Sequence, residues 1–231
     1  MHQQTKIIQS RSDVSVNKPL QIVDFEECIA FLNKKASQLS GNPFRIDPAD
    51  YEIIFKVLVY VIRDVPNAAR FKIDLNKGLL LSGPVGCGKT TLMKLINYMY
   101  AQQDRYQIKS CREVSFDFVA HGYDALHTYT SKSFVWREGM KVVRTWCFDD
   151  LGTENILKYY GNDCNAMAEI LLSRYDLFIQ KRMLTHLTTN LTAAEIETIY
   201  GNRVRSRMRE MFNLMSFDNS SRDKRGRSEQ E

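Results

Sequence analysis

The chain has 231 residues, of which 44% are hydrophobic and 26% are charged, and its formal net charge is +5 at pH 7. This composition is that of a globular protein with one main domain and a small appendage, and the mild positive charge allows nucleic-acid binding without requiring it. The five cysteines form no C-x-x-C pair, which argues against a disulfide framework or a zinc site and favours a reducing cytoplasm. No apolar run approaches the roughly 18 residues of a membrane span, so a membrane protein is not expected.

The two ends of the chain, residues 1–18 and 219–231, are polar and unpatterned. We expect a flexible N-terminus and a disordered C-terminal tail. Residues 19–72 are predicted to form a helical N-terminal extension. Apolar spacing over residues 24–39 predicts one helix that ends near Gly41, and Asp47 before Pro48 is a typical start for a second helix.

Residues 73–218 are predicted to form the main domain. Short apolar runs alternate there with helical segments, and these runs cover residues 78–82, 106–114, 142–148 and 183–189. Strands that alternate with helices indicate an α/β domain with a parallel sheet and helices on both faces.

The segment GLLLSGPVGCGKTT has the G-x-x-x-x-G-K-[ST] spacing of a P-loop, after an apolar strand and before a helical run. Glycines let the backbone amides point inward, and with the next helix's N-terminus these amides form a cradle for phosphate. Lys89 is expected to reach the β and γ phosphates of ATP, and Thr90 to offer its hydroxyl to magnesium. A redox role for Cys87 is a weaker alternative, because that position tolerates many residues. The predicted nucleotide-binding residues of the loop are Gly83, Pro84, Val85, Gly86, Cys87, Gly88, Lys89, Thr90 and Thr91.

The run VVRTWCFDDLGTE is typical of a Walker B strand, which ends in Asp149 and Asp150. Asp149 is expected to hold magnesium through a water, and Asp150 to orient or deprotonate the attacking water. Since glutamate is more usual at the second position, Glu154 is an alternative for the second role. The non-catalytic alternative is that the paired acids cap the following helix.

A third apolar run, MLTHLTTN, ends in Asn190, whose amide is a candidate contact for the γ phosphate or the attacking water. The alternative is a turn asparagine. Residues 192–195 then form a capping box for another helix. Within GNRVRSRMREM, Arg203 lies one helical turn from Arg207, and Arg205 one turn from Arg209, so the predicted helix has two basic faces.

Together these motifs resemble those of the AAA+ ATPases, in particular the DnaC/DnaI-type helicase loaders and the related IstB-type transposition ATPases. The resemblance covers about residues 77–217 and rests on GPVGCGKTT, FDDLGTE, TTN at 188–190 and GNRVRSRMRE. It implies a P-loop core with a five-stranded parallel sheet, no C-terminal helical lid, and a homo-oligomer with ATP between subunits. It also implies an arginine finger, mapped to Arg207, with Arg203 as a second phosphate or interface contact. The N-terminal extension matches no loader sequence, so the docking partner does not follow.

The resemblance implies an ATPase that loads a replicative helicase on single-stranded DNA. One alternative is an accessory ATPase that serves a transposase on duplex DNA. Another is an ATP-dependent conformational switch with little turnover, in which Asp150 catalyses poorly. Residues 123–141, rich in aromatic and basic side chains, are a candidate single-strand contact, unless Phe134 and Trp136 pack into the core.

Overall fold

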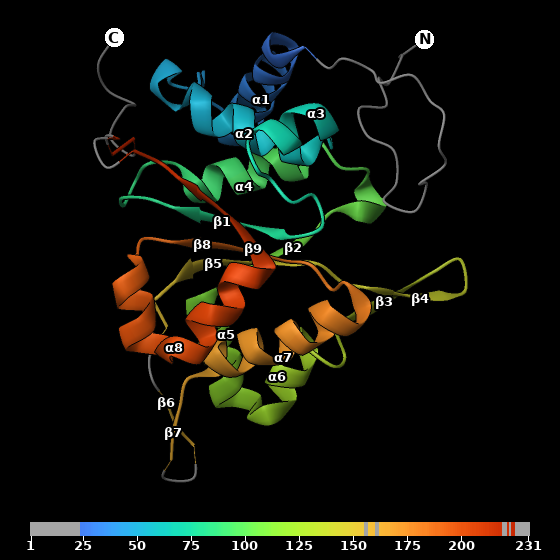
Figure 1. Ribbon diagram of the computed structural model, residues 1–231, viewed down its shortest axis with the longest axis vertical. Helices are drawn as coiled ribbons and strands as arrows, with labels where there is room; N and C mark the ends of the chain where they lie inside the picture. The colour runs from blue at the N-terminus through green and yellow to red at the C-terminus, as the bar shows by residue number, and fades with distance from the viewer. Residues whose placement is uncertain (1–23, 155–156, 160–161, 219–220, 222, 225–231) are drawn as a thin grey trace. The chain divides into compact units, whose positions relative to one another are not determined.

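The computed structural model describes residues 24–154, 157–159, 162–218, 221, 223 and 224 (Figure 1). The flexible N-terminus predicted for residues 1–18 lies outside this part of the chain. The chain divides into two compact units. One comprises residues up to Leu75 together with Thr91–Arg105, and the other comprises Asn76–Thr90 and the residues from Tyr106 onward. Among the described residues, every helix is too short or too polar to serve as a bilayer span.

The first unit is helical, as expected for the N-terminal extension. Its first helix begins after Asp24, whose carboxylate accepts a hydrogen bond from the Glu26 amide, and ends at Gly41 with a left-handed φ of 73°. Asp47 caps the short helix that starts at Pro48 in the same way. The elements are α1 (Phe25–Ser40), η1 (Pro48–Asp50), α2 (Tyr51–Val61), α3 (Val65–Arg70), the part of α4 (Lys89–Asn97) from Thr91 on, and η2 (Gln102–Asp104).

Aromatic rings join the helices of this unit. Phe25 of α1 contacts Tyr51 and Phe55 of α2 edge-on, with ring centroids 5.7 and 5.4 Å apart. Phe55 in turn contacts Phe71, which ends α3, at 5.7 Å. Edge-on contacts of this kind add to the stabilisation that burial of the rings provides.

The second unit is built on a five-stranded parallel sheet, which confirms the predicted architecture. The strands lie in the order β2-β5-β8-β1-β9, and every neighbouring pair is parallel. No helix follows β9 in the described residues, which agrees with the expected lack of a helical lid. The strands are β1 (Gly78–Ser82), β2 (Gln107–Ser110), β5 (Trp146–Leu151), β8 (Thr185–Thr189) and β9 (Phe212–Ser216).

Three of the predicted strands differ from the observed ones in their limits, while β1 coincides with the predicted 78–82. Strand β2 ends at Ser110, not at residue 114, because Ser110 and Glu113 form a capping box that starts α5 (Cys111–His121). The predicted strand 142–148 spans the end of β4 (Met140–Val143) and the start of β5. Strand β8 begins at Thr185, two residues later than predicted.

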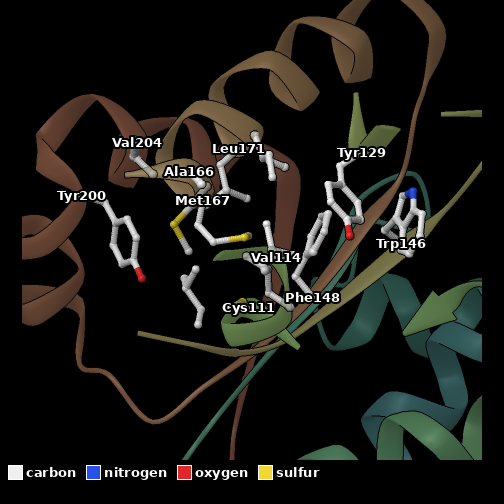
Figure 2. Close-up of a cluster of buried hydrophobic side chains, with 14 of the residues drawn as sticks. Cys111, Val114, Tyr129, Trp146, Phe148, Ala166, Met167, Leu171, Tyr200 and Val204 are labelled. Carbon is white, nitrogen blue, oxygen red and sulfur yellow. The ribbon is translucent and has the colours of Figure 1, made fainter. Parts of the chain in front are cut away.

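Helices α5, α7 (Ala166–Lys181) and α8 (Ala193–Met211) pack their apolar sides against β5 and one another (Figure 2). Phe148, Val114 and Met167 are fully buried there. The apolar positions recur at helical spacing in α7 and α8, so burial of these side chains holds the helices on the sheet.

Arg174 of α7 is buried within this unit. Its guanidinium donates to the Thr185 hydroxyl and to the carbonyl oxygens of Tyr129 and Leu184, each at 2.7 Å. Burial lowers the pKa of this guanidinium to about 9. Arg174 therefore ties α7 to the end of α6 (Tyr123–Tyr129) and to the approach to β8.

Two hairpins extend from the unit. Strand β3 (Phe134–Arg137) pairs antiparallel with β4, and β6 (Leu157–Tyr159) pairs antiparallel with β7 (Asn162–Cys164). The β3–β4 hairpin projects away from the five-stranded sheet (Figure 1). Trp136, which the sequence left as a core residue or a surface contact, is 75% exposed on this hairpin.

Candidate phosphate-binding site

The P-loop connects β1 to α4, as the sequence predicts. Gly86 and Gly88 have φ values of 80° and 104°, which side chains rarely adopt, so the turn requires glycine at these positions. Helix α4 begins at Lys89, and the positive end of its dipole therefore lies at the loop. Of the other loop residues, Val85 is 53% exposed and Cys87 is fully buried. Burial makes the Cys87 thiol a poor site for a redox switch.

Lys89 lies at the centre of the site with only 5% of its surface exposed. Its Nζ donates to the carbonyl oxygens of Gly83 and Pro84, both at 2.8 Å, and to Oδ1 of Asn190 at 2.5 Å. Three oxygen acceptors around a buried ammonium show that the site stabilises this charge and orients it. Asn190 follows directly after β8, so the structure places the predicted phosphate- or water-contacting amide against the P-loop lysine.

Thr90 and Asp149 face each other across the ends of α4 and β5. The Thr90 hydroxyl lies 2.9 and 3.0 Å from the two carboxylate oxygens of Asp149. Thr188, which is fully buried in β8, also donates to Asp149, at 2.6 Å. A hydroxyl paired with a carboxylate is a donor set that suits magnesium, which prefers oxygen ligands. The structure thus brings together the two residues predicted to hold the metal.

Asp150 is placed by an irregularity in the sheet. The pairing of β5 with β8 shifts register between Phe148 and Leu151, and Asp150 has a left-handed φ of 60°. Aspartate tolerates this conformation better than most residues, and such strained positions are frequent in functional sites. The Asp150 amide donates to Thr188 Oγ1 at 2.8 Å, and Nδ2 of Asn190 donates to the Asp150 carboxylate at 3.3 Å.

Glu154, the alternative to Asp150, is engaged in local structure. One of its carboxylate oxygens accepts from the Gly152 amide at 2.9 Å, and the other accepts from the Tyr200 hydroxyl. Burial, together with the Glu154 charge, raises the pKa of Tyr200, so this hydroxyl keeps its proton. The contacts therefore favour Asp150 over Glu154 as the carboxylate that meets a water.

Asp223 and Lys224 lie against the P-loop, a feature that sequence reasoning missed. The Lys224 amide donates to the Gly86 carbonyl at 3.1 Å, and its Nζ donates to the Cys87 carbonyl at 2.9 Å. A Cβ atom at Gly86 would lie 2.1 Å from the Asp223 carboxylate. Thr188 was also missed, although the TTN string in which it stands is part of the sequence signal.

Arg207, the predicted arginine finger, and Arg203, the predicted second phosphate or interface contact, lie on α8. The helix is interrupted at Gly201, with φ 82° and ψ 162°, and its second half buries Val204 and Met208. Arg203 is exposed. Arg207 donates to the Tyr175 hydroxyl at 3.0 Å and to Glu210 at 3.3 Å, and its guanidinium lies 4.3 Å from the Tyr175 ring centroid.

No protein-family model and no curated protein matches the sequence. Among solved structures, the crystal structure of the DnaC helicase loader is similar, with a TM-score of 0.50 and 19% identity over 75% of this chain and 92% of that chain. A putative primosome component from Streptococcus pyogenes serotype M3 gives a TM-score of 0.52 and 17% identity, over 76% of this chain and 83% of that chain. At such low identity the similarity establishes the fold alone, which this chain shares with these two solved structures.

Proposed function

We propose that this protein binds ATP with magnesium, hydrolyses it, and acts in DNA replication by loading a replicative helicase on single-stranded DNA. One observation carries the proposal. Hydrogen bonds link Lys89, Asn190, Asp150, Asp149 and Thr90 into a continuous chain where a P-loop meets the ends of two parallel strands, and Thr188 joins the backbone amide of Asp150 to the Asp149 carboxylate. Ligands of open α/β sheets bind at this end of the strands.

Each side chain then has a task that its surroundings support. The Lys89 ammonium would exchange the loop carbonyls for oxygens of the β and γ phosphates. Thr90 and Asp149 would hold magnesium, which when bound neutralises charge that develops on the phosphates. Asp150 would orient the attacking water, and Asn190, which contacts both Lys89 and Asp150, would align that water with the γ phosphate.

The place in replication is supported by the fold shared with the DnaC helicase loader. In the proposed assembly, copies of this chain form an oligomer with ATP between subunits, and Arg207 of one subunit reaches the nucleotide of the next. An arginine on the outer side of a helix suits this task, because a residue that acts on a neighbouring subunit must lie on a surface.

The nucleotide part of the proposal is tested by Lys89→Ala, with Lys94→Ala as the matched control on an exposed position of the same helix. Lys89→Ala should weaken binding of a fluorescent ATP analogue by on the order of 100-fold and abolish phosphate release. Lys94→Ala should behave as wild type, and circular dichroism should show that both variants are folded. Tight ATP binding by Lys89→Ala would refute the P-loop assignment.

The loading part needs the replicative helicase of the native host and closed circular single-stranded DNA. We expect the helicase to assemble on the circle only when this protein and ATP are both present, and Lys89→Ala to be inactive. Capture of a transposase and preference for duplex DNA would instead identify an IstB-like function. Tight ATP binding by the wild type without measurable turnover would identify a conformational switch.

A further inference from the structure

The β3–β4 hairpin presents an exposed ring in a basic setting. Trp136 is 75% exposed, whereas the other tryptophan, Trp146, is 8% exposed. Residues 132–144 contain four basic side chains and one acidic side chain. An exposed ring of this size gains little from folding, and packing within this unit does not explain why tryptophan stands at this position. The combination points to an anionic partner that has flat apolar surfaces.

The ring and the cations share one face of the hairpin. The antiparallel register pairs Trp136 with Lys141 and Phe134 with Val143, so these four side chains point to the same side. Lys141 Nζ lies 4.3 Å from the centroid of the Phe134 ring, and Nζ of Lys181, the last residue of α7, lies 5.2 Å from it. Two ammonium groups thus lie beside the Phe134 ring, and one of them belongs to the residue paired with Trp136.

The base of the hairpin is held in place. The Trp146 indole donates to the Ser133 hydroxyl at 2.7 Å, and the Arg144 amide donates to the Ser133 carbonyl at 2.9 Å. Arg174 donates to the Arg144 carbonyl at 3.4 Å. A fixed base means that the exposed ring is presented in a defined position, and little conformational entropy is lost when a ligand binds it.

We propose that this face binds single-stranded nucleic acid, with a base stacked on Trp136 and backbone phosphates held by Lys141 and Lys181. Bases offer free π faces only where the strand is unpaired, and stacking platforms beside basic side chains are how proteins hold single strands. The inference rests on the proposed function, to which it adds the surface that holds the DNA. It concerns the hairpin and the end of α7 and is independent of the P-loop.

Tryptophan fluorescence tests this proposal directly, because Trp136 is exposed and Trp146 is buried. Titration with an oligothymidine should quench the wild-type emission, while Trp136→Phe should lose the quenching and retain most of the affinity. Trp136→Ala should bind about tenfold more weakly, since the stacked base is lost. Met140→Ala is the matched control, because Met140 is 64% exposed and pairs with Arg137 on the opposite face.

Two further measurements identify the ligand. Lys141→Gln should weaken binding and reduce the dependence of the affinity on salt by roughly one released counterion. A duplex of equal length should bind more weakly and leave the Trp136 emission nearly unchanged. Equal affinity and equal quenching with the duplex would overturn the single-strand assignment.

These measurements distinguish failure of the hairpin as the contact from failure of DNA binding by the protein. If the wild type binds the oligothymidine and Trp136→Ala binds it equally well, the hairpin is not the contact, while DNA binding by the protein stands. If the wild type binds no oligothymidine, the hairpin proposal and the DNA part of the proposed function both fail. The Lys89→Ala result on ATP is unaffected in either case.

Discussion

The strand-end site and the second half of α8 carry residues that the sequence assigns to one reaction, yet the two regions are built differently. At the strand ends, Lys89, Thr90 and Asp149 are held by direct contacts to side chains from neighbouring strands or loops. On α8, Arg207 contacts Tyr175 of α7 and its own helical neighbour Glu210. The difference is what the proposed function requires, in which one chain assembles the groups that hold a nucleotide and Arg207 acts on a second copy.

Strand register determines the strand-end site, and a break in α8 determines which of its residues are exposed. The parallel register of β5 with β8 and of β8 with β1 aligns the three strand ends, so residues in the last part of β5 meet those that follow β8 and β1. On α8, the break at Gly201 starts a new helical segment whose Val204 and Met208 are buried. Since a helix buries one stripe, Ser206 between those positions is exposed, while Arg205 and Arg207 are half-buried.

The largest expected effect concerns Arg207. If it acts on the nucleotide of a neighbouring subunit, Arg207→Ala should bind ATP nearly as tightly as wild type and hydrolyse it about a thousandfold more slowly, because charge on the γ oxygens loses its partner. Arg209→Ala, at an exposed position of the same helix, is the control and should hydrolyse ATP normally. Steady-state phosphate release at several protein concentrations measures both variants.

A mixing experiment separates action between subunits from action within one subunit. Arg207→Ala keeps an intact P-loop and Lys89→Ala keeps an intact arginine, so a mixture of the two inactive proteins should regain activity at junctions that pair the intact halves. If mixed oligomers form and the mixture stays inactive, Arg207 is a solvated or DNA-facing residue. The strand-end site and α8 then do not take part in one reaction.

A smaller effect is expected at the second Walker B carboxylate. Asp150→Asn should keep ATP and magnesium binding and lower turnover by on the order of 100-fold, because an amide cannot take a proton from the attacking water. Asparagine also tolerates the left-handed backbone at this position, so the fold is preserved.

Glu154→Gln is the matched variant for Asp150→Asn. It disturbs the contacts to Gly152 and Tyr200 and should lower stability by about 1 kcal/mol with turnover close to wild type. The opposite ranking of the two turnover rates would assign the water to Glu154.

Thr188 tests whether the strand-end site is pre-organised. Thr188→Val keeps the shape of the side chain but removes the hydroxyl that donates to Asp149 and accepts from the Asp150 amide. We expect the magnesium concentration that gives half-maximal turnover to rise about tenfold, since the Asp149 carboxylate is no longer fixed. Thr198→Val, on the exposed first half of α8, provides the control. If this concentration is unchanged in Thr188→Val, Asp149 is positioned by Thr90 alone.

The sequence predicts the parts of the strand-end site that depend on local motifs, and it does not predict the contacts that depend on tertiary packing. The P-loop, the acidic strand and Asn190 were predictable, because motif spacing and strand-end positions are local properties of the sequence that the sheet then brings together. The role of Glu154 was not, since its partners Gly152 and Tyr200 are set by tertiary packing. The contact of Lys224 with the P-loop also joins residues far apart in the chain, and no local pattern marks it.

The smallest predicted effect concerns Tyr175, which holds Arg207 within its own subunit. Its hydroxyl accepts from Arg207 and donates to Glu210 at 2.8 Å, and hydrogen bonding to Glu210 raises the pKa of Tyr175. An arginine that reaches a neighbouring subunit must first leave these contacts, so they compete with assembly. Exposed contacts of this kind contribute little to stability, and Phe at this position would keep the stacking of Arg207 on the ring. Tyr175→Phe should therefore raise ATP hydrolysis about twofold at low protein concentration and leave the rate at saturation unchanged, with Tyr51→Phe in the other unit as the control. A lower rate at saturation would show instead that Tyr175 aims Arg207 at the neighbour's nucleotide, which would make the two regions parts of one positioned site.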